Sequence, residues 1–119
     1  MPITPEPPAR PPDEPPQSAP LTVEISQPEP SELHVTIAGE LDLSNLPELA
    51  DPVGAALAGA PQRLVVHAGG VRFADSSAIS LWLQWSMSVP HFELRDPPVL
   101  LRAVITTMGL GEQLGVQPG

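Results

Sequence analysis

A short valine-rich run followed by a helix-length apolar pattern constrains the fold of this chain most strongly. Residues 63–67 are typical of a buried strand, and Gly69-Gly70 indicates a turn after it. The polar residues Asp75, Ser76 and Ser77 are types that accept hydrogen bonds from the free amides at a helix start. The stretch therefore predicts a strand, a turn and a helix that begins beside two serines.

Two alternating patterns near the start of the chain predict a β-hairpin. Leu21, Val23 and Ile25 alternate with polar residues, and residues 33–38 show the same alternation. Residues 27–32, which include two prolines, separate these runs as a turn. Both strands are expected to be half buried, with polar side chains on one face.

Apolar stripes at helical spacing predict a helix on either side of the valine-rich strand. The earlier helix is expected to begin at Ser44 as its cap and to end near Gly59. Pro52 lies inside it, so we expect a kink or a restart there. The helix after Ser76 is expected to bury Trp82.

The last part of the chain repeats this order of strand and helix. Residues 91–95 predict a short edge strand, and Asp96 is expected to cap a helix that ends at Gly109. Residues 110–116 are expected to add a further helical turn. Strands separated by helices of about 10–15 residues favour βαβ units. The sequence therefore predicts an α/β fold whose mixed β-sheet is largely parallel, with an antiparallel hairpin at its start.

Residues 1–20 differ from the rest of the chain because they hold nine of its eighteen prolines and few apolar side chains. This composition favours extended polyproline-type conformations and cannot offset the entropy lost on ordering. We expect a disordered proline-rich tail over residues 1–20 and one folded domain over residues 21–117. Pro8 and Pro11 have the Pro-x-x-Pro spacing of a docking ligand, although a proline-dense segment also produces this spacing by composition alone.

Composition and charge exclude several classes of ligand. Fourteen acidic and five basic residues give a net charge of −9, which opposes binding to nucleic acids and to anionic membranes. The chain has no cysteine, and its three histidines lack metal-ligand spacing. No apolar run approaches the roughly 20 residues that span a bilayer, and the N-terminus lacks a signal-peptide pattern. We expect a cytoplasmic protein that binds no metal or other cofactor.

Catalytic signatures are also missing from the sequence. No combination of serine, histidine and acid has a supporting local motif, and no glycine-rich phosphate loop is present. We therefore expect a protein that is not an enzyme.

A serine at the start of a helix suits a phosphorylation switch. Unpaired amides of the first turn and the helix dipole stabilise a negative charge there. The alternative from the residues alone is that one serine caps the helix and the other is only solvated.

Three regions, taken in order, resemble the signature regions of the STAS domain, and specifically those of bacterial anti-sigma factor antagonists. They are Gly-Glu-Leu-Asp-Leu at residues 39–43, Val-His-Ala-Gly-Gly-Val-Arg-Phe-Ala-Asp-Ser-Ser-Ala-Ile at residues 66–79, and Val-Ile-Thr-Thr-Met-Gly-Leu at residues 104–110. The similarity covers about residues 21–116.

The resemblance implies a small STAS-type α/β domain that acts by binding. In that family the unphosphorylated antagonist captures an anti-sigma factor that is also a serine kinase, which frees a sigma factor for transcription. The kinase phosphorylates the first serine of an Asp-Ser-Ser-Gly motif and ends the complex, and a serine phosphatase restores it. Carried onto this chain, the phosphorylated residue is Ser76, and the partner-binding residues are Asp42, Asp75, Ser77 and Ala78.

Two positions depart from the family pattern. Ala78 stands where the family usually has glycine, and its methyl group is expected close to the contact surface. His67 stands where the family usually has aspartate at the end of the central strand, which removes a carboxylate near the switch. A second hypothesis is therefore a STAS scaffold that is never phosphorylated, as a subunit of a larger sensory or lipid-transport assembly.

Overall fold

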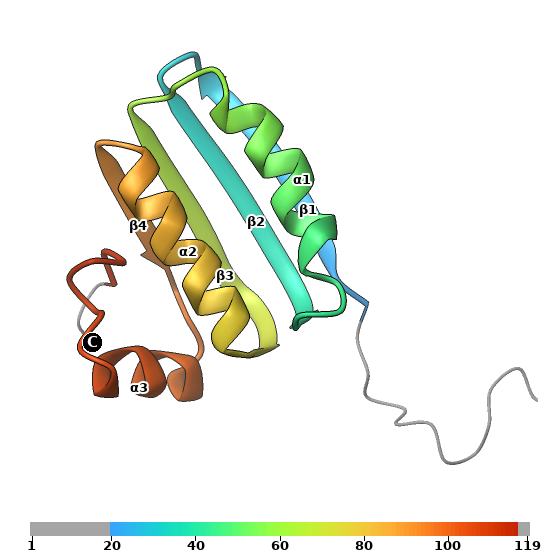
Figure 1. The fold of residues 1–119 in the computed structure, drawn as a ribbon, viewed down its shortest axis with the longest axis vertical. Helices are drawn as coiled ribbons and strands as arrows, with labels where there is room; N and C mark the ends of the chain where they lie inside the picture. The colour runs from blue at the N-terminus through green and yellow to red at the C-terminus, as the bar shows by residue number, and fades with distance from the viewer. Residues whose placement is uncertain (1–19, 117–119) are drawn as a thin grey trace, which may run out of the picture.

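A computed structural model of the chain describes residues 20–116. Its four strands form one sheet in the order β1-β2-β3-β4, as Figure 1 shows. β1 (Thr22–Glu29) and β2 (Glu32–Leu41) are antiparallel, whereas β3 (Arg63–Ala74) and β4 (His91–Arg95) continue the sheet in parallel. The predicted hairpin and mixed α/β sheet are thereby confirmed. The predicted tail, apart from Pro20, lies outside the described residues.

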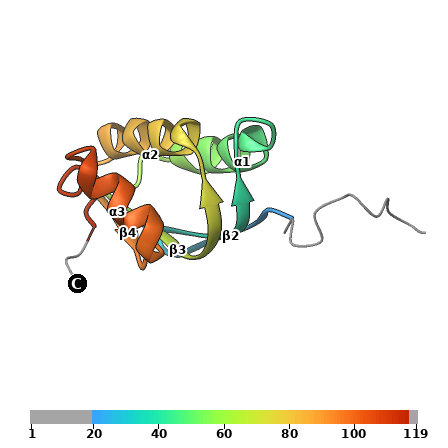
Figure 2. The ribbon, with the colours of Figure 1, turned by 90° about the horizontal axis from the view of Figure 1, so that it is seen from below.

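Two of the three helices cover one face of this sheet. α1 (Leu46–Leu57) and α2 (Ser76–Ser88) lie next to each other on that face, and α3 (Val99–Thr107) lies near the end of β3, as Figure 2 shows. The opposite face, which neither α1 nor α2 covers, is called the outer face below. It carries six polar residues of β2, β3 and β4: Glu32, His34, Arg63, His67, Glu93 and Arg95.

The hydrophobic core lies between the sheet and the two covering helices. In β2 every second side chain is buried, which places Leu33, Val35 and Ile37 on the helix side. Leu49 of α1 and Trp82 of α2 belong to the same buried cluster. The predicted inward position of Trp82 is confirmed, because its side chain is fully buried.

β3 is longer than the sequence predicts, because the chain does not turn at Gly69-Gly70. The strand continues to Ala74, and its pairing with β2 shifts register between Thr36 and Ala38. A Cβ atom on Gly70 would lie 2.9 Å from the Cβ of Ala38, so glycine lets the two strands approach closely at this irregularity. The predicted turn is wrong, and the longer strand delivers the start of α2 to the end of the sheet.

α1 begins one residue later than predicted and is continuous. Asn45 rather than Ser44 precedes its first residue, and no restart occurs at Pro52. Proline inside a helix removes one backbone hydrogen bond. Leu49 and Val53 on either side of Pro52 are fully buried, and this packing holds the helix together across the defect.

α3 ends as predicted but begins later. Asp96 is not its cap, because its φ of +56° lies outside the extended region that a cap adopts. The helix also cannot start at Pro97, since a residue before proline is disfavoured in the right-handed helical region and Pro98 follows it. The helix begins after Pro98 and ends before Gly109, whose φ of +76° suits glycine. Residues 110–116 form turns instead of the predicted helix. Leu114 from these turns is buried, and its carbonyl accepts a hydrogen bond from the Leu94 amide at 2.9 Å.

Truncation of Ile105 should destabilise the fold, because this side chain of α3 is fully buried in the core. We expect Ile105→Ala to lower the free energy of unfolding by about 2–5 kcal/mol, as large-to-small core changes do. Urea denaturation measures this change. Thr106→Ala is the matched control, since Thr106 is exposed on the same helix and should stay close to wild type. Equal effects of the two substitutions would contradict the position of α3.

Candidate functional site

The start of α2 is held by the carboxylate of Asp75. Its Oδ1 accepts hydrogen bonds from the amides of Ser77 at 3.0 Å and Ala78 at 3.2 Å, and also from the Ser77 hydroxyl. Asp75 is therefore the N-cap of the helix. The alternative that a serine caps this helix is wrong, because neither serine side chain accepts from the first-turn amides.

The same carboxylate joins the helix start to the loop between β2 and α1. Its Oδ2 accepts from the Leu43 amide at 3.2 Å, and the Asp75 amide donates to the Leu41 carbonyl at 3.2 Å. Within the loop, Asp42 accepts from the amide and the hydroxyl of Ser44. The two segments that carry the predicted site residues are thus adjacent and mutually fixed.

Ser76 and Ser77 differ in the availability of their hydroxyl groups. Ser76 is exposed as the first residue of α2, and its hydroxyl has no hydrogen bond to any part of residues 20–116. Ser77 is half buried, and its hydroxyl donates to Asp75. Of the two serines, Ser76 therefore presents the free nucleophilic oxygen at the positive end of a helix.

Hydrogen bonds keep Asp75 ionised. The Ser77 hydroxyl, followed by the amides of Ala78, Leu43 and Ser77, lowers the pKa of this carboxyl below 3.8. The residue directly before Ser76 therefore carries a negative charge at neutral pH.

Not every predicted contact residue lies on the surface. Ala78 is fully buried against the core, so its methyl group cannot touch a partner, contrary to the expectation from the sequence. Asp42 is half buried and bonded to Ser44, but it lies in the loop next to Asp75. Asp42, Asp75, Ser76 and Ser77 are brought together, whereas Ala78 supports the helix from inside.

Two exposed apolar residues beside this cluster were not predicted as site residues from the sequence. Leu43 is 71% exposed in the loop that Asp75 holds, and Phe73 is 54% exposed two residues before Asp75. Large exposed side chains grouped at one place commonly mark an interaction surface. A sequence signal for Leu43 exists, because it is an apolar residue between Asp42 and Ser44 in a segment that predicts no helix or strand.

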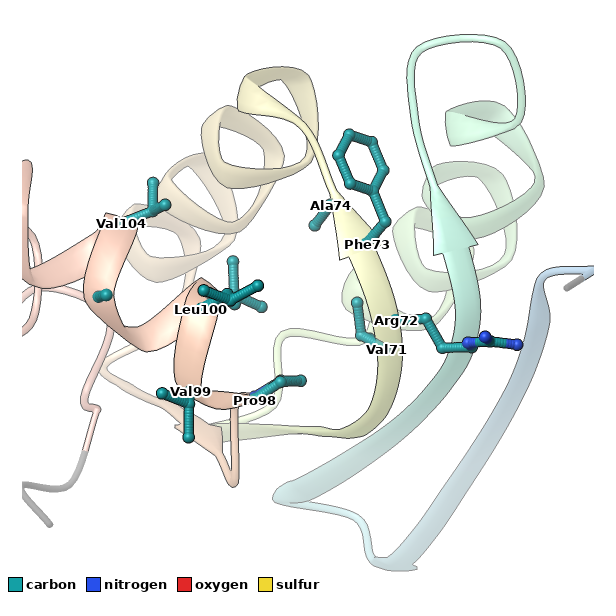
Figure 3. A pocket seen from close by; sticks show the side chains of 10 residues that line it. Val71, Arg72, Phe73, Ala74, Pro98, Val99, Leu100 and Val104 are labelled. Carbon is teal, nitrogen blue, oxygen red and sulfur yellow. The ribbon is translucent and has the colours of Figure 1, made fainter. Parts of the chain in front are cut away.

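An apolar groove begins next to Phe73. It lies between the last residues of β3 and the outer side of α3 and has a volume of about 550 Å³. Figure 3 shows Phe73 and Val71 on one side of it and Leu100 and Val104 on the other. The sequence did not predict this groove, because it depends on the continuation of β3 past the glycine pair.

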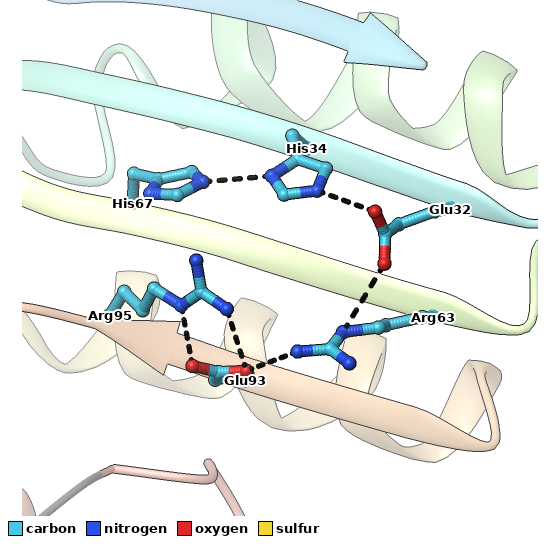
Figure 4. Close-up of polar contacts among 6 residues, drawn as sticks. All are labelled: Glu32, His34, Arg63, His67, Glu93 and Arg95. Atoms are coloured by element: carbon cyan, nitrogen blue, oxygen red, sulfur yellow. Dashed lines mark hydrogen bonds and ion pairs between the residues drawn. The ribbon is translucent and has the colours of Figure 1, made fainter. Parts of the chain in front are cut away.

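The outer face of the sheet carries a network of ionisable side chains, shown in Figure 4. His34 Nδ1 and His67 Nε2 share a hydrogen bond of 2.9 Å, and His34 Nε2 lies 3.1 Å from Glu32. Glu93 accepts from both Arg63 and Arg95. The ion pairs join neighbours both within one strand and across adjacent strands.

The structure corrects the sequence interpretation of His67. This residue does not end its strand, and it is bonded to His34 on the outer face rather than isolated. Burial, followed by the positive charges of His34 and Arg95, lowers its pKa below 6.5.

Within residues 20–116 no group of three or more candidate ligands could hold a metal ion. In the same part of the chain, no helix is long and apolar enough to cross a membrane.

Comparison with known families agrees with this architecture. The family model described as "Mlab, STAS domain" matches residues 25–117. The chain belongs to the STAS domain family. No match to a curated protein was found.

Solved structures similar to this STAS domain include anti-sigma factor antagonists. One from Mycobacterium paratuberculosis has a TM-score of 0.71 at 23% identity, with 83% of this chain and 86% of the other covered. Unphosphorylated SpoIIAA gives 0.66 at 19% identity, with coverage of 77% and 84%. The phosphorylated form of the Bacillus cell fate determinant SpoIIAA gives 0.62 at 20% identity, with coverage of 77% and 87%. At these identities the similarity establishes the shared fold.

Removal of the Asp75 carboxylate should destabilise this STAS domain. Asp75→Ala leaves the Ser77, Ala78 and Leu43 amides without their acceptor, and we expect a loss of about 0.5–2 kcal/mol in the free energy of unfolding. Asp75→Asn is the control, because asparagine also caps helices and should lose less. Because the pKa of Asp75 is lowered on folding, the wild-type contribution is present above pH 3.8 and is lost as the pH falls through the lowered value. Urea denaturation at neutral and acidic pH tests both statements.

His67 should make the stability depend on pH below neutrality. Its pKa is lower in the folded state than the ordinary 6.5, so the unfolded chain binds the proton more readily. The free energy of unfolding should therefore decrease as the pH falls from 6.5 through the lowered pKa. His67→Gln should reduce this slope, measured by urea denaturation in steps between neutral pH and the acidic side of that window. An unchanged slope in the variant would contradict the assignment.

Proposed function

We propose that this STAS domain is an anti-sigma factor antagonist. Its unphosphorylated form binds an anti-sigma factor that is also a serine kinase, and this capture releases a sigma factor for transcription. Phosphorylation of Ser76 by the kinase ends the complex, and a serine phosphatase restores it. The domain itself acts by binding and not as an enzyme, and such partners would place it in the cytoplasm.

The single observation that carries this proposal is the position of Ser76. Its hydroxyl is exposed and unbonded within the described chain, and it stands on a helix start that Asp75 holds rigidly against the neighbouring loop. A kinase needs an accessible hydroxyl in a reproducible position, which Ser77 does not offer. The shared fold with an anti-sigma factor antagonist that is solved in unphosphorylated and phosphorylated forms supports a phosphorylation switch.

The surroundings of Ser76 explain how a phosphate would act. A phosphate adds about −1.5 to −2 charges at neutral pH, next to the ionised Asp75 and close to the loop of Asp42. The exposed Leu43 and Phe73 beside it would otherwise be buried by a partner. The added charge must then be desolvated or repelled at an apolar contact, so the complex weakens.

The fold should tolerate the same modification. The phosphate would stand at the N-terminus of a helix of thirteen residues, where negative charge is stabilised by about 0.3–1 kcal/mol at exposed sites. Ser76 makes no hydroxyl contact that the phosphate would break within residues 20–116. The switch therefore acts on the docking surface and leaves the domain folded.

A second candidate is a STAS scaffold subunit that is never phosphorylated. The matching family model supports this second candidate, because its description names Mlab and not an antagonist. In that case Asp42, Asp75 and the apolar pair Leu43 and Phe73 would contact a permanent partner, and Ser76 would be an exposed residue within that contact.

Phosphorylation at Ser76 is the test of the switch. The full chain is incubated with ATP and each purified anti-sigma factor kinase of the source organism, and its intact mass is measured. We expect a gain of about 80 Da in the wild type that disappears in Ser76→Ala. Ser77→Ala is the matched control and should still be modified, because its hydroxyl is not the free one.

Binding of the same kinase provides the second readout. Wild type and Ser76→Ala should both retain it in a pull-down, whereas Ser76→Asp should lose it. Modification of Ser77→Ala but not of Ser76→Ala, together with this loss, supports the antagonist. Absence of modification with equal retention of a partner by all variants would favour the unphosphorylated scaffold.

A further inference from the structure

The groove between β3 and α3 leaves large apolar side chains exposed to solvent. Leu100 is 82% exposed and Val99 80% exposed on α3, and the exposed Phe73 lies on the β3 side of the groove, as Figure 3 shows. By contrast, the next residue of the helix, Leu101, is buried in the core. No part of residues 20–116 fills this groove, and contiguous apolar surface of this kind commonly marks a binding site.

The chain leaves the described domain close to this groove. The Pro20 carbonyl oxygen lies 2.2 Å from where a Cβ of Gly39 would stand, so Pro20 lies against β2 at that residue. Gly39 is in turn the register partner of Val71, which lines the groove. Because adjacent strands are about 4.8 Å apart, Pro20 lies on the order of 10 Å from Val71 across the sheet.

We propose that residues 1–19 dock within the same molecule into the groove between β3 and α3, as an extended proline-rich segment. These residues include eight prolines. A polyproline helix rises about 3.1 Å per residue, so nineteen residues reach roughly 60 Å, far beyond the distance required. Proline-rich segments bind aromatic-lined apolar grooves, and Phe73 supplies the aromatic ring here.

The positive charge of Arg72 at the edge of the groove suits the acidic residues of the proline-rich segment. Arg72 forms no salt bridge within residues 20–116, whereas Arg63 and Arg95 both contact Glu93. Figure 3 shows Arg72 pointing from β3 toward β2, on the side of the groove nearer to the exit of the tail. The tail carries Asp13 and Glu14, which lie seven and six residues before Pro20, respectively. A segment that crosses from Pro20 into the groove can therefore pair one of these carboxylates with Arg72.

Docking of the tail would regulate the surface described above, and this consequence rests on the proposed function. Phe73 belongs both to the groove and to the exposed pair beside Ser76, so the tail and a kinase would compete for it. A tethered segment has a high effective concentration, and even a weak contact can then compete with a separate protein. The docking itself does not depend on any kinase.

Paramagnetic relaxation in the full chain tests the contact directly. The protein has no cysteine, so Ala9→Cys carries a single nitroxide between Pro8 and Arg10. We expect the amide signals of Phe73, Leu100 and Val104 to lose most of their intensity relative to the reduced label. The amide of Ser31 is the internal reference, because it lies in the turn at the opposite end of β2 and should keep its intensity.

Substitutions at exposed groove positions distinguish the apolar contact at Leu100 from the ionic contact at Arg72. Leu100→Asp should restore the signals, because it places a charge in the apolar groove without disturbing the core. Arg72→Glu should restore them in part, and Arg72→Lys should leave the broadening in place. The fold of each variant is verified from the unchanged positions of the remaining signals.

A mixed sample identifies the source of the tail. Isotope-labelled protein without nitroxide is combined with unlabelled, spin-labelled protein, and intramolecular docking predicts no broadening. Broadening in this mixture would show that a second copy supplies the tail and would overturn the proposal. Uniform weak broadening, broadening away from the groove, or persistence of the effect in Leu100→Asp would overturn it as well. None of these outcomes depends on whether Ser76 is phosphorylated.

Discussion

The carboxylate of Asp75 is the contact on which the organisation of this molecule depends. One oxygen caps α2, and the other holds the amide of Leu43 in the loop between β2 and α1. A helix start and a loop that are distant in sequence thereby become one surface. Without this group two first-turn amides would lack an acceptor, and the loop would lose its contact with α2. Ser76 is presented reproducibly because its neighbour, and not Ser76 itself, satisfies the helix.

The surface of this STAS domain is divided between two kinds of chemistry. On the outer face, the polar side chains have partners among themselves, since Glu93 accepts from Arg63 and Arg95 and the two histidines share a hydrogen bond. At the end of the sheet, by contrast, Leu43 and Phe73 are exposed beside the charge of Asp75. A surface that combines apolar side chains with one free hydroxyl responds strongly to an added phosphate, because the phosphate changes both its charge and its hydration. The outer face has no comparable unsatisfied feature among these six residues.

Sequence reasoning succeeded where short-range patterns decide the structure. The hairpin follows from strict alternation of apolar and polar residues, and Trp82 follows from helical spacing. It failed at Gly69-Gly70, where two glycines predicted a turn, because pairing with β2 continues through an irregular register that no local pattern reveals. It also failed at the helix starts, since Asn45 and Pro98 precede α1 and α3 in place of Ser44 and Asp96. For α3 the cause is local sterics, because Pro98 disfavours a helical conformation of Pro97 and the helix starts only after the second proline.

The sequence by itself determined the class of fold, the order of its elements and the segment that carries Ser76, because apolar periodicity and helix-start chemistry are local properties of the chain. Only the tertiary structure decided which hydroxyl is free, that Ala78 is buried, and that Leu43 and Phe73 lie beside Ser76. Only it revealed the groove between β3 and α3. These features depend on the length of β3 and on a hydrogen bond between segments more than thirty residues apart. Contacts of this kind arise from packing and strand register, which a linear pattern does not encode.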